Sequence, residues 1–185
     1  MKRRDVLLAA GATLAAGCST SGGSDPGAKR REIDTAVDTA LSDLYTAKPA
    51  TRELVTRARG VLVFPNVVSA GFVIGGSYGQ GALREGGKTT GYYSVGAGSV
   101  GLLAGAQTKA MYLLFMTQDG LTKFKSSESG WTAGADASVA VADMGADAQI
   151  DTRTANAPVI GVVRSKEGLM ANLSLDGTKV SKLQL

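Results

Sequence analysis

The chain has 185 residues, 44% of them apolar, and its 20 Lys and Arg against 16 Asp and Glu give a formal net charge of +4. This length and apolar content predict one domain with a sizeable core. The absence of histidine excludes Ser–His and Cys–His nucleophile pairs and removes the commonest transition-metal ligand. A single cysteine excludes an internal disulfide framework, and no basic stretch is interleaved with aromatics, so nucleic-acid binding is not expected.

The first 17 residues read as an export signal. Arg3 and Arg4 lie in a short basic start, and the apolar run that follows is shorter than the roughly 20 residues that span a bilayer. Gly17 followed by Cys18 resembles a bacterial lipobox, in which the thiol is acylated and becomes the new N-terminus. Arg3-Arg4 also resembles a twin-arginine signal, so both this route and the general secretory route stay open. An ordinary secretory signal with an unmodified Cys18 is the alternative.

Residues 18–28 are rich in Gly and Ser and predict a flexible tether between the acylated cysteine and the domain. Ser19 follows Cys18, and with no Asp there to retain a lipoprotein at the inner membrane, the outer membrane of a bacterial cell envelope is the expected location. Whether the domain faces the periplasm or the cell surface stays open. Removal of residues 1–17 leaves 17 basic against 15 acidic residues, so the remaining chain is nearly neutral.

Two helices are predicted after the tether. Residues 29–45 place Ile33, Val37 and Leu44 at helical spacing on one apolar face. Pro49 suits the start of a second, short helix over residues 50–58, which Gly60 ends.

From Gly60 onward the pattern changes to strands and turns. The turn at residues 85–88 predicts a hairpin. Strands are expected at residues 61–64 (ended by Pro65), 67–78, 81–84, 89–95, 110–117 (ended at Asp119-Gly120), 131–141, 148–152, 158–164 and 169–175. Two helices followed by many strands predict an α+β domain, with N-terminal helices packed on a mostly antiparallel sheet. The dense glycines between residues 71 and 105 predict that this sheet is strongly curved or barrel-like.

Two sequence patterns raise the possibility of a bound nucleotide or metal ion, and neither fits the requirements of such a site. Residues 96–101 (GAGSVG) match the dinucleotide fingerprint, yet the segment before the next strand is too short for the required helix, and no second βαβ half is present. We therefore expect no nucleotide. The carboxylates Asp136, Asp143, Asp147 and Asp151 are not spaced as a calcium loop, so we expect no metal and no other cofactor.

One basic grouping remains once the signal is removed. Its members lie at the start of the first helix and around the second: Lys29, Arg30, Arg31, Arg52, Arg57 and Arg59. Anionic lipid headgroups attract such residues by about 1 kcal/mol each near the surface. Ordinary solubility explains them equally well.

Several blocks, in order, resemble the SYLF domain, a lipid-binding module of bacterial lipoproteins and of eukaryotic membrane and actin-patch proteins. The matching blocks are residues 58–67 (ARGVLVFPNV), 70–79 (AGFVIGGSYG), 99–117, 134–141, 165–170 and 175–177. The resemblance implies a compact β-rich domain with N-terminal helices and phospholipid binding. It brings no catalytic residues.

The sequence thus favours a lipid-anchored, non-catalytic envelope protein in which residues 29–185 bind phospholipid. The alternative function is a protein-interaction or structural module of the cell envelope without direct lipid binding. An enzyme that uses carboxylates alone is a third hypothesis.

Overall fold

A computed structural model of the chain describes residues 25–71, 74–100, 105–141, 157–165, 168–169, 175 and 177–185. The signal, Cys18 and the strand expected at residues 148–152 lie outside these ranges. The helices are α1 (Pro26–Ala47), α2 (Thr51–Arg57) and α3 (Gln118–Ser126). The strands are β1 (Gly60–Gly71), β2 (Ile74–Glu85), β3 (Lys88–Val100), β4 (Gly105–Phe115), β5 (Trp131–Thr132), β6 (Val139–Val141), β7 (Val159–Ser165), β8 (Gly168–Leu169) and β9 (Lys179–Lys182).

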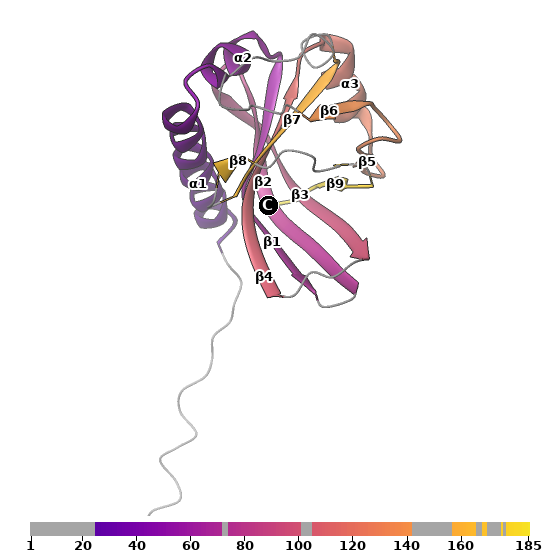
Figure 1. Ribbon diagram of the computed structural model, residues 1–185. Coiled ribbons are helices and arrows are strands. Elements are labelled where there is room, and N and C mark those ends of the chain that lie inside the picture. The colour runs from indigo at the N-terminus through magenta and orange to yellow at the C-terminus, as the bar shows by residue number, and fades with distance from the viewer. Residues whose placement is uncertain are drawn as a thin grey trace, which may run out of the picture.

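The strands form one nine-stranded sheet in the order β5-β9-β3-β2-β1-β4-β7-β6, with β8 paired to β7. All the pairs are antiparallel except β6 with β7. Figure 1 shows the sheet strongly curved, with α1 and α2 along one side and α3 on the other. The predicted α+β class and the mostly antiparallel, strongly curved sheet are confirmed.

Helix α1 begins earlier and ends later than the sequence predicts. The Asp25 side chain accepts hydrogen bonds from the backbone N–H groups of Gly27 and Ala28 at 3.1 and 3.0 Å. Pro26 has no N–H group to satisfy and suits the first helical position. The last residues of the expected tether are therefore helical, and α1 starts directly against the sheet.

The core has two parts, one on each face of the sheet. On one face, the buried side of α1 (Ile33, Val37, Ala40 and Leu44) packs with α2 against residues of β1, β4 and β7. On the other face, α3 joins an aromatic cluster in which the ring centroids of Phe115 and Phe124 lie 4.8 Å apart. The continuous apolar runs of β1 (residues 61–64), β4 (111–115) and β7 (159–163) are therefore covered on both faces.

Helix α3 was not predicted, because Asp119-Gly120 reads as a turn after an apolar strand. In the structure Thr117 caps the helix, its side chain accepting from the backbone N–H of Gly120 at 3.2 Å. Leu121 and Phe124 are then buried one helical turn apart. A short polar segment with two such apolar residues is enough for a nine-residue helix once it packs on the sheet.

The predicted boundaries of the first strands were wrong in two places. Pro65 does not end β1, because the pairing with both neighbours shifts register there, and a bulge tolerates a residue without an N–H group. The strand expected at residues 67–78 is divided between β1 and β2. These two strands form an antiparallel hairpin in which Gly71 lies opposite Gly75. No Pro, Asn or Asp marks this hairpin in the sequence.

Later strands also differ from expectation. The segment expected as one strand at residues 131–141 forms two short strands, β5 and β6, joined by a turn. Strand β9 was missed, and β7 was predicted closely. Gly96 and Gly98 of the dinucleotide-like motif lie within β3 and pair with β2, so they do not form the turn into a helix that such a motif needs.

Candidate functional site

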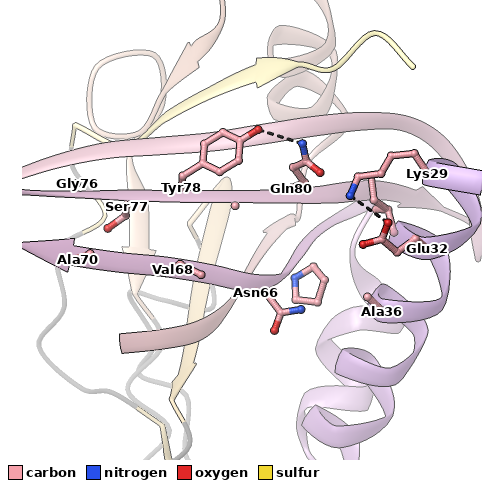
Figure 2. Close-up of a pocket in the computed structure, with 13 residues that line it drawn as sticks. Lys29, Glu32, Ala36, Asn66, Val68, Ala70, Gly76, Ser77, Tyr78 and Gln80 are labelled. Carbon is pink, nitrogen blue, oxygen red and sulfur yellow. Dashed lines mark hydrogen bonds and ion pairs between the residues drawn. The ribbon is translucent and has the colours of Figure 1, made fainter. Parts of the chain in front are cut away.

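A groove of about 540 Å³ lies between the first turns of α1 and the outer parts of β1 and β2. We call it the α1–β2 groove, and Figure 2 shows its walls. It is lined by Lys29, Glu32, Ile33, Ala36, Pro65, Asn66, Val68, Ala70, Gly76, Ser77, Tyr78, Gly79 and Gln80. Its volume lies within the range of small-molecule sites, and most of its lining is apolar.

Two large apolar side chains of the described residues are exposed, Val68 (48%) and Tyr78 (56%), and both belong to this groove. They lie directly opposite one another on β1 and β2. Neighbouring positions on the same face carry small residues, since Tyr78 pairs with Gly96 and Ala70 pairs with Gly76. The result is an exposed apolar strip around Val68 and Tyr78, which we call the Val68–Tyr78 strip. Contiguous apolar surface of this kind commonly marks a binding site, whereas single exposed apolar residues do not.

Polar groups border the strip on both sides. The Lys29 ammonium lies 3.1 Å from a carboxylate oxygen of Glu32 on the α1 side. On β2, the Gln80 amide donates a hydrogen bond of 3.0 Å to the Tyr78 hydroxyl. Both interactions are drawn in Figure 2. The groove therefore offers an apolar floor with charged and hydrogen-bonding groups at its rim.

A polar cluster holds α1 in place beside the groove. Asp34 of α1 accepts hydrogen bonds from Thr89 at 2.7 Å and from Tyr92 at 2.9 Å, both on β3. The guanidinium of Arg84, which is only 15% exposed, lies 3.6 Å from Asp34 and 2.6 Å from Asp38. Burial raises the pKa of Tyr92, and its hydrogen bond to the Asp34 carboxylate raises the pKa further, so this hydroxyl keeps its proton and remains a donor.

The six basic residues chosen from the sequence do not form one surface. Lys29, Arg30 and Arg31 lie at the start of α1, while the other three lie around α2 at its far end. From Arg30 to the end of α1 at Ala47 the helix advances 17 residues, which at 1.5 Å per residue separates the two groups by about 26 Å. Of the six, only Lys29 lines the α1–β2 groove.

Each residue of the first group also has a partner. Lys29 pairs with Glu32, and Arg31 lies 3.6 Å from Asp25. Arg30 donates to the backbone oxygen of Leu185.

The second group is more open to solvent. Arg52 stacks over the ring of Tyr45, its guanidinium carbon 4.7 Å from the centroid. Arg57 and Arg59 are exposed.

Within the described ranges, no three His, Cys, Asp or Glu side chains gather closely enough to hold a metal ion. Among the described helices, none is both long enough and apolar enough to cross a membrane.

Comparison with known families places the second half of the chain. Residues 96–184 match the Ysc84 family, described as Las17-binding protein actin regulator. This confirms the resemblance to SYLF-domain proteins, and no curated protein matches the chain. The Ysc84 match begins within β3, so the α1–β2 groove lies wholly on residues that precede it.

The sequence reasoning missed Val68 and Tyr78. It treated residues 67–78 as one strand, which would place these two residues far apart instead of opposite each other. A usable signal was present, since no charged residue occurs between Arg59 and Arg84. A stretch of that length without charge in a strand-rich domain indicates that some of its apolar surface faces something other than water.

Proposed function

We propose that this chain is a lipid-anchored, non-catalytic protein of the bacterial envelope whose domain binds phospholipid. Acylated Cys18 anchors the protein in the outer membrane after export by the twin-arginine or general secretory route. The domain then contacts the membrane surface through the region around the α1–β2 groove. On this proposal the chain is a member of the bacterial lipoprotein branch of the SYLF-domain proteins.

One observation carries the proposal: two exposed apolar side chains and the basic Lys29 line one groove beside the first turns of α1. Val68 and Tyr78 supply the apolar surface, and Lys29 lies on the opposite wall of the same groove. Phospholipids present a headgroup with a negatively charged phosphate above apolar chains, so they match this combination. Asp25, where the described structure begins, lies seven positions after Cys18, at this same end of α1.

The test is co-sedimentation of residues 19–185, which retain all the described elements but lack Cys18, with vesicles. Pure phosphatidylcholine vesicles and vesicles that also contain phosphatidylglycerol should both carry the protein into the pellet at low salt. Protein that stays in the supernatant with both vesicle types contradicts the lipid-binding role. Intact-mass measurement of the mature protein tests the anchor separately, since acylation adds the mass of the lipid to a chain that begins at Cys18.

A second function, a protein-interaction module of the envelope, is supported by the description of the Ysc84 family as Las17-binding. In that case the Val68–Tyr78 strip contacts a protein. Cross-linking in intact cells from a photoreactive residue at position 78 separates the two functions. A discrete protein adduct favours the interaction module, whereas adducts with lipid favour the first proposal.

A further inference from the structure

One end of the sheet is built without charge. No charged residue occurs between Arg59 and Arg84 or between Lys88 and Lys109, although Lys, Arg, Asp and Glu make up 19% of the chain. The pairing registers bring these two stretches together, because β1 and β2 form one hairpin while β3 and β4 flank it. We call the outer part of the four strands the uncharged hairpin end; it comprises residues 66–71, 74–80, 95–100 and 105–108.

This end extends past the start of α1. Figure 1 shows β1 to β4 reaching below the first turn of the helix, where no described helix covers them. Val68, Ala70, Gly76, Tyr78 and Gly98 are all exposed on it. A soluble domain rarely leaves so much uncharged sheet surface in contact with water.

At this end the backbone of the two central strands pairs with a neighbour on both sides over residues 67–71 and 75–80. β1 pairs with β2 on one side and with β4 on the other, through Gly71 opposite both Gly75 and Gly105. β2 pairs with β1 and β3, through Ile74 opposite Val100. Paired N–H and C=O groups remove the main cost of moving a strand from water into an apolar medium. Val68 and Tyr78 both lie on these inner strands.

We propose that the uncharged hairpin end enters the boundary between the headgroups and the acyl chains of a phospholipid bilayer, with Val68 and Tyr78 in contact with the acyl chains. This inference rests on the proposed function and specifies how the domain binds: by apolar insertion, with charge in a secondary role. Insertion to this boundary suits the structure, because tyrosine prefers the interface, where its ring is apolar and its hydroxyl meets water.

The position of the chain outside the structure favours a bilayer as the occupant. From Cys18 to Asp25 the chain spans at most about 24 Å when fully extended. An acyl anchor at Cys18 therefore holds the start of α1, and the hairpin end next to it, within reach of the membrane. Lys29 and Arg31 lie where headgroup phosphates would surround the inserted apolar surface.

The charges that bound the uncharged end fit the same orientation. Lys109 is the first charged residue on β4, and burial lowers its pKa. On β2 and β3 the first charges are Arg84 and Lys88, next to the hairpin turn at the opposite end of these strands. The limit of the insertion is thus set by where the charged residues begin.

Fluorescence quenching of the full chain reconstituted in phosphatidylcholine vesicles tests the insertion. The chain has one tryptophan, Trp131, which is 2% exposed in the core and supplies a constant background. Tyr78→Trp places a reporter on the hairpin end, and Thr122→Trp places a matched reporter on the exposed face of α3. Both positions are exposed, so both variants should unfold at the same urea concentration as the wild type.

With phospholipids brominated on their acyl chains, we expect the emission of the reporter at position 78 to fall about twofold, because this position contacts the apolar region. The emission of the reporter at position 122 should stay unchanged. The quenching at position 78 should persist in 0.5 M NaCl, where charge-driven contacts are screened to about 4 Å. If Tyr78→Trp alters stability, Val68→Trp provides the same readout from the neighbouring strand.

Three results overturn the insertion. Equal quenching of the two reporters, or none at position 78, shows that the hairpin end stays outside the bilayer. If the reporter at position 78 is no longer quenched more than the reporter at position 122 in 0.5 M NaCl, charge drives the contact. A blue shift of the position 78 reporter without vesicles, together with a dimeric mass, shows that a second copy covers the strip. In each case, binding of residues 19–185 to vesicles would still support the proposed function, and its absence would contradict that function separately.

Discussion

Replacing Asp34 with alanine tests whether the polar cluster between α1 and β3 holds the helix on the sheet. The change removes the acceptor of two hydrogen bonds, from Thr89 and Tyr92, and one of the two carboxylates that face Arg84. A hydrogen bond to a charged group contributes about 1.5–3 kcal/mol. The Asp34 side chain is 32% exposed, so water replaces part of this interaction. We therefore expect the free energy of unfolding to fall by about 2–3 kcal/mol.

Asp38→Ala is the matched control. Asp38 also pairs with Arg84, at 2.6 Å, but its side chain is 69% exposed. Because Asp38 is largely exposed and Arg84 keeps Asp34 as a partner in this variant, the loss should be at most about 1 kcal/mol. Urea unfolding followed by Trp131 fluorescence and circular dichroism gives both values.

A double-mutant cycle adds a second check. Combining Asp34→Ala with Tyr92→Phe should reveal a coupling of about 1 kcal/mol, because the two side chains interact directly. If Asp34→Ala costs no more than Asp38→Ala, or if the coupling is zero, the cluster does not fix the position of α1. The groove wall would then depend on apolar packing alone.

Two further predictions concern the core. Gly81→Ala should destabilise the fold by about 3 kcal/mol, because the added Cβ would lie 1.9 Å from the carbonyl oxygen of Val63. Gly98→Ala is the control and should change stability by less than about 1 kcal/mol, because a Cβ there meets nothing within 4 Å. Equal melting temperatures of the two variants would contradict the close approach of β1 and β2. Tyr112→Phe should cost about 1 kcal/mol by removing a 2.8 Å hydrogen bond from the buried hydroxyl to the backbone oxygen of Ala40. Burial raises the pKa of Tyr112 to about 12 from 10.0, so the unfolded chain releases this proton first and wild-type stability should fall as the pH rises from 10 towards 12. The urea midpoint of Tyr112→Phe should fall less than that of the wild type between pH 10 and pH 12. The same pH dependence in both proteins would contradict the raised pKa of Tyr112.

The sequence predicts the class of fold well, because periodicity and turn residues are local signals. The apolar spacing of Ile33, Val37 and Leu44 correctly places one face of α1, and the turn at residues 85–88 correctly places the hairpin of β2 and β3. The hairpin between β1 and β2 was missed because its apolar sequence carries no turn signal. Helix α3 was missed because its stability depends on burial of Leu121 and Phe124 against a sheet that local patterns do not describe.

The candidate site was harder to predict than the fold. The basic residues at 29–31 and 52–59 are grouped in sequence, yet the length of α1 separates them in space. Val68 and Tyr78 are ten positions apart, and only the register of β1 with β2 brings them together. That register depends on the bulge at Pro65, which shifts the pairing of β1 with β2. The sequence predicted instead that Pro65 ends the strand.

The strand order has a consequence for how this domain can be divided. Residues 96–184 contain the outer part of β3 and all of β4, but β2 and β1 lie between these two strands in the sheet. A fragment excised at Gly96 would therefore consist of two half-sheets with a gap about 14 Å wide between them, since neighbouring strands lie about 4.8 Å apart. We therefore expect that residues 96–184 do not fold on their own, and that grafting them onto another protein would require β1 and β2 to be included.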